Sequence, residues 1–173
     1  MESINAPHWH LLLNHAPIFG GLFSIGLMLY AFIRKDIELK RAALWANLVT
    51  AIVSYFADST GGAAARIVIN AGLVSRDLVR EHRWAADVAL WVMMLAGFLA
   101  LLGLVLGRRV NRTSESPKIF NGFVVATFVV SLAAAGLMGW VSELGGEIRH
   151  TEMHFSKAVT DSLLKVQPPQ APK

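Results

Sequence analysis

The sequence predicts an all-α integral membrane protein, an up-down-up-down four-helix bundle with a short interfacial helical segment between its second and third helices. Three observations support this fold class. Of the 173 residues, 54% are hydrophobic and only 16% are charged, whereas soluble domains carry about 25% charged residues. The mean hydropathy is positive, at +0.49. Four long apolar runs alternate with short polar segments, which leaves too little polar sequence to coat a soluble bundle.

The apolar runs predict membrane spans at about 12–33, 41–58, 83–107 and 118–143. About 20 helical residues cross the roughly 30 Å hydrocarbon core of a bilayer. The third and fourth runs are long enough alone, whereas the first and second need their flanking residues. We expect residues 1–155 to form a single membrane domain and residues 156–173 to form a flexible tail.

Within the first span, Pro17 suits the first turn of a helix, where its missing N–H costs no hydrogen bond. Asn14 or His15 would then lie near the N-cap. Between the second and third spans, the segment 58–83 alternates apolar residues with arginines, which predicts one or two short amphipathic helices at the interface. In the last two spans, close helix packing is the expected role of four glycines: Gly97, Gly103, Gly136 and Gly139.

Lysine and arginine residues predict the orientation. They are dense in the loops after the first and third spans: Arg34, Lys35, Lys40, Arg41, Arg108, Arg109, Arg112 and Lys118. Cytoplasmic loops carry such an excess, so both termini are expected in the periplasm, with the chain in a bacterial inner membrane. The opening MESINAPHWH lacks a basic n-region, so no signal peptide is predicted. Basic clusters beside apolar runs suit a bilayer surface and not nucleic acid.

All six histidines fall at the predicted outer end of the bundle: His8, His10, His15, His82, His150 and His154. Four carboxylates join them: Asp58, Asp87, Glu143 and Glu147. An ionisable group in hydrocarbon costs about 2.5–3.5 kcal/mol and is normally paired or functional. The absence of cysteine excludes disulfides, thiolate zinc sites and covalent haem. The cluster therefore predicts an imidazole site for haem or a metal ion.

The leading hypothesis is a redox protein that binds one or two b-type haems for electron transfer. The expected axial ligands are His10, His15, His82 and His150. Two imidazoles leave iron no open position, which favours electron transfer over oxygen chemistry. A quinone or a periplasmic cytochrome would be the redox partner, and Arg83 or Arg149 would neutralise a propionate.

Two alternatives remain open. One is a copper, zinc or iron site drawn from His8, His15, His82, His150, His154, Asp58 and Glu147. The other is a non-catalytic subunit of a redox complex, or of a homo-oligomer, with structural histidines. No phosphate loop, nucleophile elbow or H-E-x-x-H motif is present, and no catalytic residue is assigned. An electron-transfer or accessory role is therefore favoured over an enzyme acting alone.

Two stretches carry a resemblance to a known family. HLLLNHAPI (residues 10–18) resembles the H-P-x-x-x-H-F-P-I opening of a bacterial membrane family catalogued as domain of unknown function 2231, and GWVSELGGEIRHTE (residues 139–152) resembles the end of that family's last helix. The resemblance implies a four-span membrane protein, and it matches His10, His15, His82 and His150 to family histidines. This chain departs from the pattern at Leu11, Ala16 and Thr151. The resemblance defines sites and assigns no activity.

Overall fold

The computed structural model describes residues 6–110 and 118–149, and every regular element within them is helical. The elements are α1 (Ala6–Leu13), α2 (Ala16–Arg34), α3 (Ile37–Asn70), α4 (Arg76–Leu106), the 3-10 turn η1 (Gly107–Arg109) and α5 (Lys118–Arg149). The predicted all-α class is confirmed. The tail expected at 156–173 lies outside the described residues.

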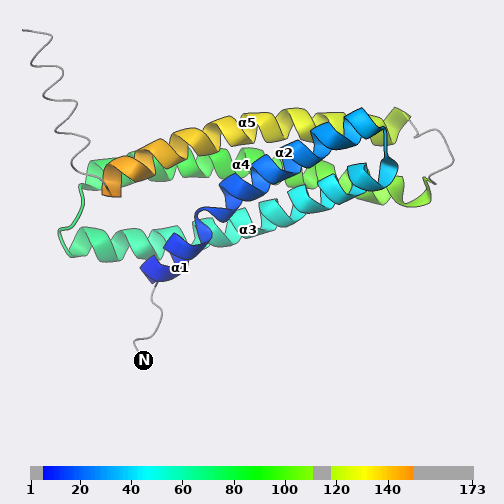
Figure 1. The fold of residues 1–173 in the computed structure, drawn as a ribbon. Coiled ribbons are helices and arrows are strands. Elements are labelled where there is room, and N and C mark those ends of the chain that lie inside the picture. The colour runs from blue at the N-terminus through cyan, green and yellow to red at the C-terminus, as the bar shows by residue number, and fades with distance from the viewer. Residues whose placement is uncertain (1–5, 111–117, 150–173) are drawn as a thin grey trace, which may run out of the picture.

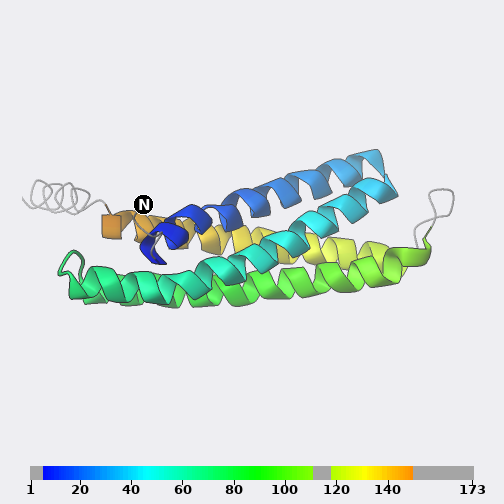
Figure 2. The same cartoon turned by 90° about the horizontal axis from the view of Figure 1, so that it is seen from below.

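The four long helices lie side by side along one direction (Figure 1). Short turns connect α2 to α3 and α3 to α4, so consecutive helices reverse direction and pack against each other. α5 packs along α4 and also contacts α2. Figure 2 shows α3 beside α2 near their shared turn and beside α4 further along.

Three helical stretches are long and apolar enough to cross a membrane, judged by length and composition: Ala6–Arg34, Arg76–Leu106 and Lys118–Ile148. α3 is not among them, because polar residues interrupt its apolar sequence. Four of these polar residues are buried inside the bundle: Lys40, Asn47, Thr50 and Ser54. The exposed side of the same helix is apolar, with Trp45, Val49, Ile52 and Phe56.

The first predicted span is divided into two helices. α1 ends at Leu13, and α2 begins after His15, which occupies the N-cap position with Pro17 in the first turn. This confirms the prediction for Pro17, whose ring suits that turn. α1 turns aside to pack against α3, and this contact places His10 against the bundle.

The prediction of separate interfacial helices at 58–83 is wrong. Residues up to Asn70 continue α3 without a break, and α4 begins at Arg76. The chain turns only between them, where Gly72 adopts a positive φ of 68° and the Ser75 side chain accepts a hydrogen bond from the Asp77 N–H. The alternation of arginine with apolar residues therefore reflects two long helices with exposed arginines and not helices lying flat.

The prediction for the glycines is half confirmed. A Cβ at Gly97 would lie 2.5 Å from the Ala51 Cβ, and one at Gly103 would lie 3.0 Å from Leu44 Cδ1. Both glycines are buried and permit close approach of α3 and α4. Gly136 and Gly139 are exposed, and a Cβ at either would meet nothing within 4 Å. The prediction that these two pack closely is wrong because they lie on the outward face of α5.

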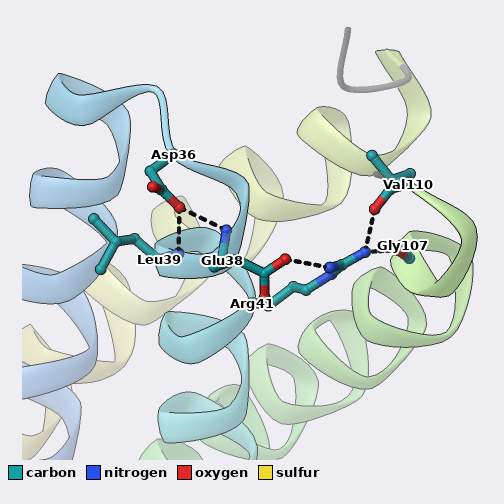
Figure 3. Close-up of polar contacts among 6 residues, drawn as sticks. All are labelled: Asp36, Glu38, Leu39, Arg41, Gly107 and Val110. Carbon is teal, nitrogen blue, oxygen red and sulfur yellow. Dashed lines mark hydrogen bonds and ion pairs between the residues drawn. The ribbon is translucent and has the colours of Figure 1, made fainter. Parts of the chain in front are cut away.

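Polar contacts fix the end of the bundle opposite α1 (Figure 3). Asp36 caps α3 by accepting hydrogen bonds from the N–H groups of Glu38 and Leu39 at 2.7 and 3.1 Å. Arg41 donates to Glu38 and to the carbonyl oxygens of Gly107 and Val110. A cation at these carbonyls stabilises the negative end of the α4 dipole, so α3 and α4 are joined where α4 ends.

Candidate functional site

At the other end of the bundle, α1 packs against α3 (Figure 1). The start of α4 and the end of α5, which pack against each other, lie at the same end of the bundle. Two predicted ligands lie here in the described residues, His10 on α1 and His82 on α4. Both side chains are partly buried. Each imidazole crosses to a neighbouring helix.

The His10 ring is anchored to α3. Its Nδ1 lies 3.1 Å from the Ala57 carbonyl oxygen and 3.3 Å from Thr60 Oγ1. The Thr60 hydroxyl itself donates to the Ala57 carbonyl at 2.7 Å. Since a carbonyl oxygen only accepts, Nδ1 carries a hydrogen, and in the neutral ring Nε2 then has the lone pair.

The His82 ring is anchored to α5 by a hydrogen bond of the same kind. Its Nδ1 donates to the Val141 carbonyl oxygen at 3.1 Å, so its Nε2 is also the basic nitrogen. Within the described part of the chain, neither Nε2 has a hydrogen-bond partner. An Nδ1–H bonded to a carbonyl, with Nε2 available, is the state in which histidine ligates metals.

Each ring lies against a helical glycine. A Cβ at Gly61 would come within 3.2 Å of His10 Cε1, and one at Gly145 would come within 3.3 Å of His82 Cε1. Both glycines begin a Gly-Gly pair, 61–62 on α3 and 145–146 on α5. A side chain larger than glycine at position 61 or 145 would therefore reduce the space that the neighbouring imidazole ring occupies.

Charged groups lie near His10. Asp58 lies within electrostatic range of His10, Arg83 and Asp87, and His10 lies within range of His82. A Cβ at Gly62 would lie 3.4 Å from Arg83 Nη1. This places the Arg83 guanidinium beside α3, where it can neutralise an anionic group close to the histidines.

The other predicted residues are placed differently. His8 and His15 have exposed side chains, and His15 makes no side-chain cap hydrogen bond at the start of α2. Glu147 is partly buried on α5. His150 and His154 lie outside the described residues, as does the side chain of Arg149.

In residues 6–110 and 118–149, no group of three or more histidine, aspartate or glutamate side chains could hold a metal ion. The described members of the predicted metal site, His8, His15, His82, Asp58 and Glu147, thus do not converge on one point. The site that remains is a pair of imidazoles from different helices. Sequence reasoning did not find the supporting groups Thr60, Gly61 and Gly145. The two helical Gly-Gly pairs were the available signal.

No family model, curated protein or solved structure matches the chain. The resemblance to the family described above therefore stays a prediction.

Proposed function

We propose that the chain crosses the inner membrane of a bacterium four times, with both termini in the periplasm. Besides the three stretches that are long and apolar enough to span, α3 would be the additional span, second in chain order. Its side chains support this: its buried face is polar and its exposed face is apolar, for example at Trp45, Val49 and Phe56. An apolar exterior suits lipid, and polar groups at membrane depth face the bundle interior. The dense lysines and arginines beside the α2–α3 turn and the end of α4 favour the cytoplasmic side for that end.

We further propose that the protein is a membrane redox protein whose outer end binds a b-type haem through His10 and His82, for electron transfer. One observation carries this proposal: both imidazoles are held by Nδ1–H···O=C bonds to a neighbouring helix, and both Nε2 atoms lack a partner among the described residues. Two imidazole nitrogens of this kind, in a chain without cysteine, would suit a b-type haem as ligands. The predicted ligands His15 and His150 are not needed for this pair.

The chain supplies orientation, charge and basicity to such a site. The Ala57 and Val141 carbonyls fix the ring planes and raise the basicity of Nε2. Arg83 provides the positive charge that an acidic side arm of the macrocycle requires. When bound by two imidazoles, haem supplies one-electron chemistry without an open position for oxygen. A quinone or a periplasmic cytochrome would exchange electrons with it.

Replacing His82 with glycine and adding imidazole tests the assignment. We expect His82→Gly to lose the haem absorbance of the purified protein and exogenous imidazole to restore it, because the free base can occupy the space of the deleted ring. The matched control is His15→Ala, which removes an exposed ring and should keep full absorbance. Full haem content in His82→Gly without imidazole would refute the ligand role.

A metal ion in place of haem is the second candidate, and the proximity of Asp58 to His10 favours it. Carboxylate and imidazole together suit zinc, copper or iron. Elemental analysis of protein with no porphyrin absorbance would support this alternative if one metal ion were found per chain. If neither metal nor haem copurified, a purely structural role in a redox complex would be favoured.

A further inference from the structure

A groove lies between α4 and α5 near the histidine end. Five residues line it: Arg80, Glu81, Trp84, Trp140 and Leu144. The groove is open on one side and has a volume of about 460 Å³, a size found among small-molecule sites of about 300–1,000 Å³. Its wall is almost entirely apolar, and its charged groups come from the first turns of α4.

The groove and the anchored His82 ring both lie at the contact between α4 and α5. Glu81 precedes His82 on α4, and Trp140 precedes Val141, the acceptor of the His82 ring, on α5. Consecutive helical residues point about 100° apart. A molecule in the groove would therefore lie beside residues that are next to His82 and next to its acceptor in the sequence, and on a different face of each helix.

The indoles of Trp84 and Trp140 meet edge to face, with ring centroids 5.6 Å apart and an interplanar angle of 78°. Trp84 is 60% exposed and Trp140 39% exposed. Aromatic rings prefer offset-stacked or edge-to-face neighbours. The exposed indole surface therefore suits a flat ring as the occupant.

The charges in the groove disfavour a phosphate headgroup. Arg80 is already paired with Asp77 at 3.1 Å. Glu81 is exposed and forms no ion pair with any described residue, so its carboxylate would repel an anion. The same carboxylate accepts hydrogen bonds, and it would accept one from a hydroxyl group on a neutral ring.

We infer that this groove binds the head ring of a membrane-soluble hydroquinone, with the ring against Trp84 and Trp140 and one hydroxyl group donating to Glu81. Binding itself does not depend on a redox centre. The use of the bound hydroquinone as an electron donor rests on the proposed function.

The test compares the two oxidation states of one probe, decylubiquinone and its reduced form, by saturable quenching of tryptophan fluorescence in the full chain purified without haem. Only the reduced form has hydroxyl hydrogens to donate. Glu81→Gln should therefore raise the dissociation constant of the reduced form about tenfold, since a hydrogen bond to a charged group contributes about 1.5–3 kcal/mol. It should not weaken binding of the oxidised form, whose carbonyl oxygens can accept a hydrogen bond from the glutamine amide but not from the carboxylate. Glu143→Gln is the matched control, because Glu143 is an exposed carboxylate on α5 that does not line the groove.

Two further variants locate the site. Leu144→Trp fills the groove and should abolish saturable quenching by both forms. Trp84→Phe should remove most of the quenched signal, whereas Trp91→Phe, at a 75% exposed position further along α4, should not. These results do not require haem, so failure of haem binding would leave the test intact.

Equal affinity of Glu81→Gln and the unaltered protein for the reduced form would overturn the inference. So would displacement of the probe by phosphatidylglycerol vesicles together with tighter vesicle binding by Glu81→Gln. That outcome would identify the groove as a phospholipid site.

Discussion

The imidazoles of His10 and His82 are oriented by backbone carbonyls and not by carboxylates. Each Nδ1 donates to a carbonyl one helix away, at 3.1 Å in both cases. A carbonyl holds the ring without adding charge, whereas a carboxylate partner would favour the imidazolium form. Neutral imidazole is the form that binds metals, so the two anchors keep both rings ready to act as ligands.

The glycine beneath each ring should matter to ligand binding. A Cβ at Gly145 would lie 3.3 Å from His82 Cε1, so Gly145→Ala must displace the ring by a few tenths of an ångström. We expect about tenfold weaker haem binding, the lower end of the about 10–100-fold loss typical when a ligand's support is disturbed. Haem titration of the apoprotein measures this change.

Gly146→Ala is the matched control, because a Cβ there would meet nothing within 4 Å. It should bind haem normally and gain helix stability, up to about 1 kcal/mol. Equal haem affinity of the two alanine variants would show that the contact at Gly145 has no bearing on His82.

The sequence predicts where His10 and His82 lie better than it predicts what they contact. His10 and His82 follow from the collection of histidines at one end of four helices, a consequence of topology alone. Thr60 and Gly61 could not be assigned, because their contact with His10 depends on α1 turning aside toward α3. For the same reason, the exposed position of His15 at the α1–α2 junction does not follow from spacing.

At the scale of the element, α3 differs from an ordinary apolar membrane helix because several of its buried side chains are polar. Its buried hydroxyls satisfy themselves locally: Thr50 donates to the Ala46 carbonyl at 2.8 Å and Ser54 to the Thr50 carbonyl at 2.8 Å. Its longer polar side chains cross to α5: Lys40 Nζ donates to Asn121 Oδ1 at 2.9 Å and Asn47 Nδ2 to Ser131 Oγ at 2.6 Å. Polar groups thus join α3 to α5 across the bundle.

Thr127 on α5 is the exception among these buried hydroxyls. It is fully buried, yet its Oγ1 has no partner among the described residues. An unsatisfied buried polar group costs about 1–3 kcal/mol, so the isosteric change Thr127→Val should stabilise the protein by about that amount. The free energy of unfolding in a detergent titration measures it.

Thr50→Val provides the comparison, because it removes a hydroxyl that is hydrogen-bonded. It should destabilise the protein by about 0.5–1 kcal/mol, in line with polar contacts in membrane helices. A Thr127→Val variant less stable than Thr50→Val would mean that the Thr127 hydroxyl has a favourable partner after all.

The sequence predicts a helix boundary where a local residue marks it. It does not predict a boundary that depends on packing between distant residues. Pro17 marks the first turn of α2. The continuation of α3 through Gly61-Gly62 to Asn70 was not predictable, because two adjacent glycines ordinarily weaken a helix. Here His10 and Arg83 pack over that pair, and a contact between distant residues cannot be inferred from propensity.

At the scale of the molecule, the exposed surface is largely apolar along all four long helices, with large side chains such as Phe23, Trp45, Trp91 and Val129 exposed. At about 1.5 Å per residue, α3, α4 and α5 are each about 45–51 Å long, which exceeds the roughly 30 Å hydrocarbon core. If α3 and α4 both span, as proposed, the turn between them should stand clear of the hydrocarbon core.

Labelling of single cysteines tests whether α3 crosses the membrane. The chain has no cysteine of its own, so Ser75→Cys and Asp36→Cys each give one thiol, at opposite ends of α3. We expect a membrane-impermeant maleimide to label position 75 in intact spheroplasts and position 36 only after permeabilisation. Labelling of both positions from the same side would show that α3 does not span.

The central claim is that two anchored histidines hold a redox cofactor. Its most direct test is a reduced-minus-oxidised optical spectrum of the protein purified in mild detergent, recorded for the unaltered chain and for His10→Gly and His82→Gly. We predict a sharp Soret and α-band pair that is lost in both variants. A flat spectrum from well-folded protein expressed with ample haem, or bands unchanged in both variants, would contradict the claim.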